Sequence, residues 1–312
     1  MGDKHTEKLG ADQAGIGRAA ALLEAGGLVA LPTETVYGLA ARADRAEAVA
    51  ALYRAKGRPD FNPLIVHVPD LAAAERLAQF DERALALVRR FWPGPLTLVL
   101  PLLPEAAIAP AVTAGLPTIA LRCPAHPIMR AVLKASGLPL AAPSANRSGA
   151  VSPTAPEHVR ASLEGRIDAV LDGGTSERGL ESTIVAVREN GWQLLRAGPV
   201  PERDLVALLG APMEMQSARI EAPGQLAQHY SPGKPVRLNA SEAAADEFMI
   251  GFGAIAGDCN LSPTGDLPEA AARLYAALHA AAASAHPKVA VAPIPDHHIG
   301  AAINDRLRRA AA

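Results

Sequence analysis

The stretch LVALPTETVYG, residues 28–38, joins a short apolar strand to a polar loop. The strand, Leu28 to Leu31, follows a helical pattern over Asp12 to Ala25 that two glycines close. Pro32 to Gly38 then places hydroxyls, a carboxylate and a phenol at the end of the strand, where open α/β sheets bind their ligands. An ST-turn stabilised by its own hydroxyl explains Thr33, but not the whole run.

Helical and strand patterns alternate over the first two hundred residues. Asp44 to Ala55 predicts a helix with Asp44 as its N-cap and Glu47 at the capping-box position. Asn190-Gly191 predicts a hairpin turn, which adds an antiparallel element to continuous apolar strands of the kind that helices cover. We therefore expect an α/β fold whose large N-terminal domain has a twisted mixed sheet flanked by helices. Further strands are expected at 64–68, 96–100, 118–122, 138–142, 168–171, 182–187 and 192–196, with helices from Asp70, Asp81 and His126.

The composition changes after about Leu209. Prolines and glycines without clear periodicity indicate a linker over residues 210–235. Beyond it, three apolar strands and two helices predict a small C-terminal α/β domain, Rossmann-like, over 236–312. We therefore expect a catalytic domain over 1–209, followed by the linker and this small domain.

Composition excludes several classes of protein. The formal net charge of −2 over 312 residues provides no overall field that would gather nucleic acid. The polar start and the absence of an eighteen-residue apolar run predict a cytoplasmic protein that does not span a membrane. Two cysteines, Cys123 and Cys259, are too few for a disulfide framework or a zinc cluster, and no metal ligands are predicted. A P-loop kinase is excluded because its glycine-rich motif is missing.

A cationic segment, Lys56-Gly57-Arg58-Pro59, follows the helix at 44–55, and a small polar turn, Pro143-Ser144-Ala145-Asn146, lies far along the chain. Arginine binds phosphate oxygens two at a time, while lysine adds a compact mobile charge. Together the two segments suggest a triphosphate site. The alternative is a solvated helix end whose cations complement the helix dipole. For His67, on an apolar strand, the alternative is an ordinary core histidine.

With these pieces together, the chain resembles the threonylcarbamoyl-AMP synthase family in its two-domain form, which has a YrdC-like catalytic domain. Eight segments in order carry the resemblance, and the linker and the C-terminal helix add two signatures of the two-domain form. The eight are PTETVYG at 32–38, KGRP at 56–59, NPLIVHV at 62–68, FWPGPLTLVL at 91–100, TIALRCPAHP at 118–127, APSANRSG at 142–149, GLESTIV at 179–185 and LRAGP at 195–199; the two signatures are HYSP at 229–232 and GAAINDRL at 300–307.

The resemblance implies a nucleotidyltransferase, an L-threonylcarbamoyladenylate synthase. L-threonine, bicarbonate and ATP would become threonylcarbamoyl-AMP and pyrophosphate, the first step in making N6-threonylcarbamoyladenosine at position 37 of tRNA. No protein nucleophile is required, so the site must supply alignment and compensation of phosphate charge. Mg²⁺ would arrive with ATP, held largely by phosphates and water.

The resemblance also implies roles for individual residues. Lys56, Arg58 and Tyr230 would be catalytic, with Tyr230 reaching over the site as a lid that excludes water. The guanidinium of Arg122 would face the carboxylate of threonine. The ATP-binding positions would be Lys56, Arg58, Asn62, Thr118, Ala142, Ser144, Asn146, Ser152, Arg196 and Tyr230, and the threonine-binding positions Thr35, His67, Arg122 and Ser182.

The expected partners are the small-molecule substrates and a tRNA-modifying transferase complex that receives the adenylate, with weak or no direct binding of nucleic acid. Two other classes stay open. One is an RNA-binding or ribosome-associated module, although 4% aromatic residues offer few stacking side chains. The other is a carbamoyl-adenylate enzyme that handles carbamoyl phosphate, which is expected to carry zinc-finger cysteines.

Overall fold

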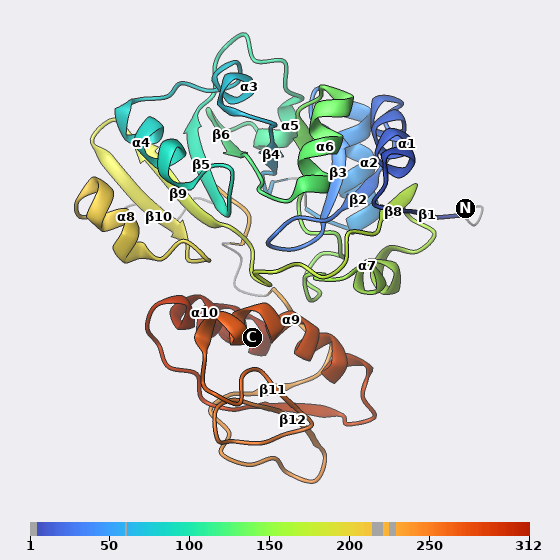
Figure 1. The fold of residues 1–312 in the computed structure, drawn as a ribbon, viewed down its shortest axis with the longest axis vertical. Coiled ribbons are helices and arrows are strands. Elements are labelled where there is room, and N and C mark those ends of the chain that lie inside the picture. Colours follow the sequence, from blue (N-terminus) through green and yellow to red (C-terminus); the bar gives the residue numbers. More distant parts are fainter. Residues whose placement is uncertain (1–4, 60, 214–220, 225–228) are drawn as a thin grey trace.

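The protein forms two α/β units, one above the other in Figure 1, each built on its own sheet. The structure is a computed structural model and describes residues 5–59, 61–213, 221–224 and 229–312. The larger sheet has ten strands in the order β1-β8-β2-β3-β7-β4-β6-β5-β9-β10, and the smaller has four in the order β11-β14-β12-β13. The α/β fold class with a large mixed sheet and a small second unit is therefore confirmed.

The larger sheet is mixed because its strands run in both directions. β2 (Val29–Leu31) pairs antiparallel with β3 (Gly38–Arg42), and β4 (Ile65–His67) pairs parallel with β6 (Thr118–Arg122). The predicted hairpin is present as an antiparallel pair at the end of the sheet. The other strands are β1 (Glu7–Leu9), β5 (Leu96–Pro101), β7 (Leu140–Ala141), β8 (Ala169–Leu171), β9 (Thr183–Arg188) and β10 (Gly191–Arg196).

Helices cover this sheet, as its uniformly apolar strands require. Buried leucines and valines of the helices pack against those of the strands in two clusters of the larger unit. The helices are α1 (Gln13–Glu24), α2 (Ala46–Lys56), α3 (Leu71–Glu75), α4 (Glu82–Phe91), α5 (Pro110–Thr113), α6 (Pro127–Ser136), α7 (Pro156–Leu163) and α8 (Glu202–Leu209).

The smaller unit presents two helices to the larger one (Figure 1). Its four strands are all parallel. Its apolar cluster includes Val36, Val151 and Leu180 of the larger unit, so the two units share a core. The elements are β11 (Val236–Arg237), β12 (Glu247–Gly251), β13 (Cys259–Asn260), α9 (Leu267–Ala283), β14 (Lys288–Val291) and α10 (Ile299–Ala311).

Three of the four aspartates expected to open helices do so, and the fourth does not. The carboxylates of Asp12, Asp70 and Asp81 each accept an N–H from the first turn of their helix. The prediction for Asp44 was wrong, because α2 begins at Ala46 without a side-chain cap. Both oxygens of Asp44 are instead bound by the guanidinium of Arg42, at 2.7 and 2.8 Å. The bidentate ion pair with Arg42 takes the place of the single hydrogen bond by which Asp44 would have capped α2.

Several elements of the fold were not anticipated. Strands β1, β3 and β13 and helices α5, α7 and α8 had no predicted counterpart, although β3 begins at Gly38, directly after the polar loop. Because β3 is antiparallel to β2, the loop at 32–37 connects two neighbouring strands rather than a strand and a helix.

The predicted linker at 210–235 lies partly outside the described residues, at 214–220 and 225–228. In the part of the chain that is described, no helix is both long and apolar enough to span a membrane.

Replacing the N-cap of α1 tests how this helix begins. Asp12→Ala removes the acceptor of the Gly15 N–H and is expected to lower the free energy of unfolding by about 1 kcal/mol. Asp12→Asn keeps a side-chain oxygen at the cap and should lose much less. Denaturant unfolding of both variants checks this, and equal losses would contradict a capping role.

Candidate active site

One pocket collects side chains from most of the segments that the sequence singled out. Its walls come from the loop after β2, the loop after α2, strands β4 and β6, the turn after β7 and the entry to β9. Eight predicted site residues line it together. They are Thr35, Arg58, His67, Arg122, Ala142, Ser144, Ser182 and Arg196.

The other predicted residues do not line this pocket, but most of them support its wall. Thr118 begins β6, at the opposite end of that strand from Arg122, and is half-buried. Tyr230 is fully buried, with its ring stacked against Tyr275 at a centroid distance of 5.5 Å. The other four residues are buried, and each forms a hydrogen bond with a residue that lines the pocket; they are Lys56, Asn62, Asn146 and Ser152.

Lys56 is the last residue of α2 and ties that helix to the polar turn. Its buried ammonium donates to the carbonyl oxygens of Ser144 and Asn146, at 2.6 and 2.5 Å. Burial lowers the pKa of Lys56 well below its usual value, and the nearby charge of Arg58 lowers it further. An ammonium has one more N–H to donate, so Lys56 can hold the turn and still bind an anion.

Arg58 returns toward the pocket because the helix ends at Gly57, whose left-handed backbone (φ 60°) favours glycine. Its guanidinium donates to the carbonyl oxygens of Asn62 and Pro63. Burial lowers the pKa of Arg58 to about 10. The interpretation of this segment as a solvated helix end is therefore wrong, because Lys56 is buried and Arg58 lines the pocket.

Several buried polar atoms around the pocket have no partner among the described residues. They include Oδ1 of Asn62, Nδ1 of His67, Oδ1 of Asn146 and Nδ1 of His229. The amide nitrogen of Asn146 is occupied, since it donates to the carbonyls of Arg147 and Ala150. Unpaired buried polar atoms are costly and rare in folded proteins, which makes such a cluster typical of a binding site without its ligand.

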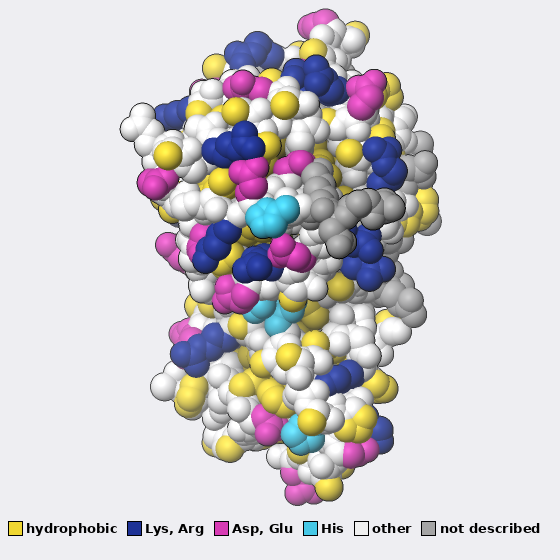
Figure 2. Space-filling view, turned by 90° about the vertical axis from the view of Figure 1, so that its right-hand side faces the viewer, with side chains coloured by type: hydrophobic (Ala, Val, Ile, Leu, Met, Phe, Trp, Pro, Cys, Tyr) yellow, Lys and Arg dark blue, Asp and Glu magenta, His cyan; other side chains and the backbone are white. Residues whose placement is uncertain are grey.

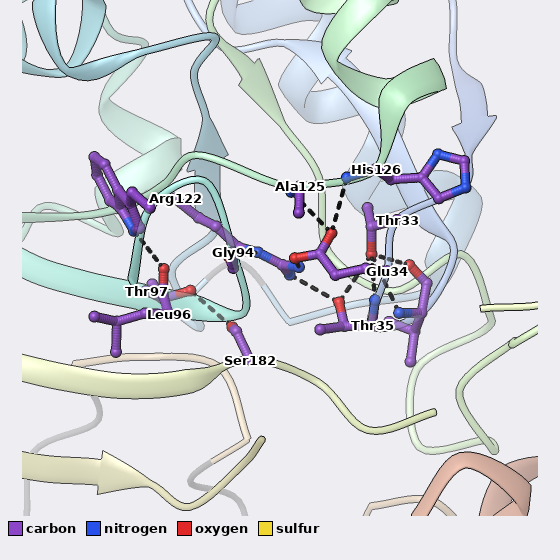
Figure 3. A network of polar contacts seen from close by, with 12 residues as sticks. Thr33, Glu34, Thr35, Gly94, Leu96, Thr97, Arg122, Ala125, His126 and Ser182 are labelled. Carbon is purple, nitrogen blue, oxygen red and sulfur yellow. Dashed lines mark hydrogen bonds and ion pairs between the residues drawn. The ribbon is translucent and has the colours of Figure 1, made fainter. Parts of the chain in front are cut away.

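Arg122 forms the centre of a network that Figure 3 shows. Its guanidinium donates to Oε1 of Glu34 at 2.6 Å, to Oγ1 of Thr35 at 2.8 Å and to the carbonyl of Gly94. The other oxygen of Glu34 accepts two backbone N–H groups at 125–126. Burial raises the pKa of Glu34, but the charge of Arg122 and these hydrogen bonds outweigh burial and lower it.

Among the described residues, Arg122 has partners for three of its five N–H groups, which leaves two for a ligand carboxylate. No sequence pattern indicated a role for Glu34, although its carboxylate lies in the polar loop after β2. Thr33 forms the expected ST-turn, because its hydroxyl accepts the N–H groups of Thr35 and Val36.

Ser182 and Arg196 form the opposite wall. The hydroxyl of Ser182 lies 2.7 Å from that of Thr97, and Arg196 donates to the same hydroxyl at 3.1 Å and to the Ser182 carbonyl at 3.0 Å. Arg196 is 7% exposed, so it is a buried cation and not a surface charge. Its third contact is the carbonyl of Pro223, beyond β10 in the predicted linker.

Ser152 was expected to contact the nucleotide, and its hydroxyl donates to Oε1 of Glu181 at 2.6 Å. The other oxygen of Glu181 accepts from Tyr275 at 2.8 Å and from Arg306 at 3.2 Å. Burial raises the pKa of Glu181, but the charges of Arg306 and Arg196 lower it to about 2. Sequence reasoning gave none of these three partners a role. Glu181 and Arg306 lie in segments that carry the resemblance, whereas Tyr275 lies in none of them.

The charges around the pocket do not balance. Arg122 pairs with Glu34, and Arg306 pairs with Glu181. Lys56, Arg58 and Arg196 form no ion pair with any described residue and are held by neutral oxygens. The pocket therefore keeps an excess of buried positive charge. The outer face in Figure 2, in contrast, intermixes basic and acidic side chains over the surface.

The fold and this pocket place the chain among the α/β proteins in which a large mixed sheet carries a buried cationic site and a small parallel sheet packs beside it. The Sua5/YciO/YrdC family model, described as telomere recombination, matches residues 21–198, and the model of the C-terminal domain of threonylcarbamoyl-AMP synthase matches residues 193–312. The chain belongs to the threonylcarbamoyl-AMP synthase family.

Individual relatives agree with this assignment. The threonylcarbamoyl-AMP synthase of Bacillus subtilis is 45% identical over 240 residues, covering 75% of this chain and 69% of the relative. That of Pyrococcus abyssi is 43% identical over 226 residues, covering 70% and 66%. A crystal structure of P. abyssi Sua5 complexed with L-threonine superposes with a TM-score of 0.88 at 33% identity, covering 98% of this chain and 97% of that one.

The buried His67 generates a prediction about pH. Burial, followed by the charge of Arg122, lowers the pKa of this histidine to about 3 in the folded protein. The unfolded chain therefore binds a proton near pH 6.5 that the folded protein does not, and stability falls as pH decreases from 6.5 toward 3. His67→Gln should reduce this slope by about 1.4 kcal/mol per pH unit near pH 5.

Denaturant unfolding between pH 5 and 8 measures the slope, and His297→Gln, at an exposed position, is the control. An identical slope in wild type and His67→Gln would contradict a neutral, buried histidine.

Proposed function

We propose that this protein is an enzyme that forms threonylcarbamoyl-AMP and pyrophosphate from L-threonine, bicarbonate and ATP, which makes it a nucleotidyltransferase. The amine of threonine adds to bicarbonate with loss of water and gives an N-carboxylate. A carboxylate oxygen then attacks the α-phosphorus, and the bond to pyrophosphate breaks. The product is the first intermediate of N6-threonylcarbamoyladenosine in tRNA. The family assignment supports this reaction.

The observation that carries the proposal is a set of three cations that pair with no carboxylate of the described residues. Lys56, Arg58 and Arg196 lie in or behind one pocket and are held by neutral oxygens only. Buried cations of this kind stabilise a polyanion strongly, because little water screens them. A triphosphate provides the matching charge. We therefore assign the triphosphate to these cations and to the turn at Ser144 and Asn146.

The remaining nucleotide contacts are proposals from the family pattern. We assign Asn62, Thr118 and Ser152, with the backbone of Ala142, to the nucleoside part of ATP. Oδ1 of Asn62 has no partner among the described residues, which supports its assignment, since a base or ribose donor would satisfy it.

Threonine is assigned to Thr35, His67, Arg122 and Ser182. Two N–H groups of Arg122 remain for the carboxylate of the substrate, and Nδ1 of His67 has no partner among the described residues. Burial keeps this imidazole neutral near pH 7. A neutral ring can accept or donate a hydrogen bond without adding charge beside the amine of threonine.

Mg²⁺ is proposed to enter as the complex with ATP. The carboxylates beside the pocket, Glu34 and Glu181, are each bound to an arginine, and the described residues contain no cluster of His, Cys, Asp and Glu that could hold a metal ion. Phosphate oxygens and water would then provide the ligands of Mg²⁺. The protein's own groups supply alignment and positive charge to the reaction.

We propose that residues 1–209 form the catalytic domain, 210–235 the linker and 236–312 the second domain. Tyr230 in the linker is assigned as a lid residue, because the mixed anhydride formed in the reaction hydrolyses readily and excluding water protects it. The proposed location is the cytoplasm, and the proposed recipient of the adenylate is a tRNA-modifying transferase complex.

Pyrophosphate release from ATP by the purified protein tests the reaction. Release should require both threonine and bicarbonate, and mass spectrometry should find threonylcarbamoyl-AMP. Release without either substrate would indicate a nucleotide hydrolase and overturn the proposal. No release at all would overturn it too, and salt-dependent RNA binding by that inactive protein would favour the RNA-binding alternative.

Arg58→Ala tests the cationic pocket. Losing a charge-assisted contact to the triphosphate should cost about 2.7 kcal/mol of transition-state stabilisation, on the order of 100-fold in kcat/KM for ATP. Arg54→Ala removes the same charge from an exposed position on α2 and should leave kcat/KM close to that of wild type. Near-normal kcat/KM in Arg58→Ala would contradict a role in binding phosphate.

A further inference from the structure

The loop before β9 is packed directly against the second unit. Gly179 has φ of 70°, and a Cβ at this position would lie 2.5 Å from backbone atoms of Ala271 and Ala272 in α9. Leu180, the next residue, belongs to the apolar core of the smaller unit. The two residues that follow, Glu181 and Ser182, line the pocket. Docking of α9 therefore determines where this part of the pocket wall lies.

Glu181 connects the two units chemically. It is 7% exposed, and one of its oxygens accepts from Ser152 in the larger unit. The other oxygen accepts from Tyr275 of α9 and from Arg306 of α10. A carboxylate that lines the pocket thus depends on two side chains of the smaller unit for the partners of one oxygen.

Arg306 is held in place by several contacts at once. It is fully buried, and besides Glu181 it donates to the carbonyl of Ala197 at 2.9 Å and to the carboxylate of Asp305 at 2.8 Å. Its guanidinium also lies 5.6 Å from the centre of the Tyr230 ring. Ala197 directly follows Arg196, so Arg306 fixes both the carboxylate and the backbone beside a pocket cation.

The sign of the charge on Glu181 matters for an anionic ligand. An uncompensated carboxylate in the pocket wall would repel phosphate and would attract Arg196 away from it. The charge of Arg306 neutralises Glu181, so that Lys56, Arg58 and Arg196 remain available to the ligand. The hydroxyl of Tyr275 adds a second donor on the same carboxylate.

We propose that Arg306 and Tyr275 are positioning residues for nucleotide binding, and that the smaller unit completes the ATP site by neutralising and holding Glu181. Neither residue lines the pocket, so both act through the groups they contact, chiefly Glu181 and, for Arg306, also the carbonyl of Ala197. The inference rests on the proposed function to the extent that it takes the anionic ligand to be ATP.

Arg306→Met tests the inference, because it removes the charge and keeps much of the buried volume. Calorimetry with a non-hydrolysable ATP analogue should show binding weakened on the order of tenfold, with a similar increase in the KM for ATP. Values of kcat at saturating ATP and of KM for threonine should change much less. Arg308→Met, at an exposed position two residues further along α10, is the matched control and should bind the analogue like wild type.

A double variant separates neutralisation from a merely structural role. Arg306→Met combined with Glu181→Gln leaves no net charge at the pair and keeps an amide oxygen for the hydroxyl of Ser152. Analogue binding should therefore recover toward that of wild type. If both residues only supported the fold, the decreases in analogue affinity caused by the two substitutions would add, and that result would overturn the proposal. Unchanged analogue binding in Arg306→Met would overturn it too.

Thermal unfolding of each variant shows whether it is folded. If Arg306→Met does not fold, the double variant and Tyr275→Phe carry the test. Tyr275→Phe keeps the stacked ring and removes one donor to Glu181, and its analogue binding should weaken by a smaller factor than expected for Arg306→Met. Wild-type binding in Tyr275→Phe together with weakened binding in the double variant would overturn the proposal.

The direct binding measurement also separates this inference from the proposed function. Wild-type protein that binds the analogue but makes no threonylcarbamoyl-AMP would contradict the proposed function. The inference would then be decided by the effect of Arg306→Met on analogue binding alone. Active wild-type protein whose analogue binding does not respond to Arg306→Met would contradict the inference alone.

Discussion

Burying several cations around one pocket is the constraint that organises this structure. Removing a cation from water costs several kcal/mol unless other groups compensate. Two arginines are compensated by carboxylates, Arg122 by Glu34 and Arg306 by Glu181. Lys56 and Arg196 are compensated by neutral oxygens, most of them main-chain carbonyls. Neutral oxygens satisfy the donors without cancelling the charge, so the pocket stays positive inside a protein whose net charge is only −2.

The same contacts connect segments that are far apart in the chain. Lys56 joins the end of α2 to the turn at 144–146, and Arg122 joins β6 to the loop after β2. Each contact satisfies a buried donor and also fixes the distance between two walls of the pocket. The site is therefore preorganised by the interactions that make its burial tolerable, which is the arrangement that electrostatic catalysis requires.

The second unit belongs to this arrangement. Its helices α9 and α10 provide Tyr275 and Arg306 to the carboxylate of Glu181, and its core includes Leu180. Tyr275 and Arg306 lie 94 and 125 residues from Glu181 in the sequence. The unit has its own parallel sheet, but it packs in part against the loop that carries one wall of the pocket. A change in how the unit docks would therefore alter the site itself.

The sequence by itself determined the α/β class, the order of most strands and helices, the family, and a set of site candidates of which eight line one pocket. Apolar periodicity and turn preferences depend on residues that are close in the sequence, so they predict helices, strands and turns without knowledge of the fold. Asp44 shows the limit of such patterns. Its carboxylate binds Arg42 instead of capping α2, and the capping pattern takes no account of that competing ion pair. Only the tertiary structure decided that Arg196 is buried, that Glu34 pairs with Arg122, and that Arg306 reaches Glu181 across the two units. Those outcomes depend on which distant groups share a low-dielectric space, and that is set when the sheets and helices pack.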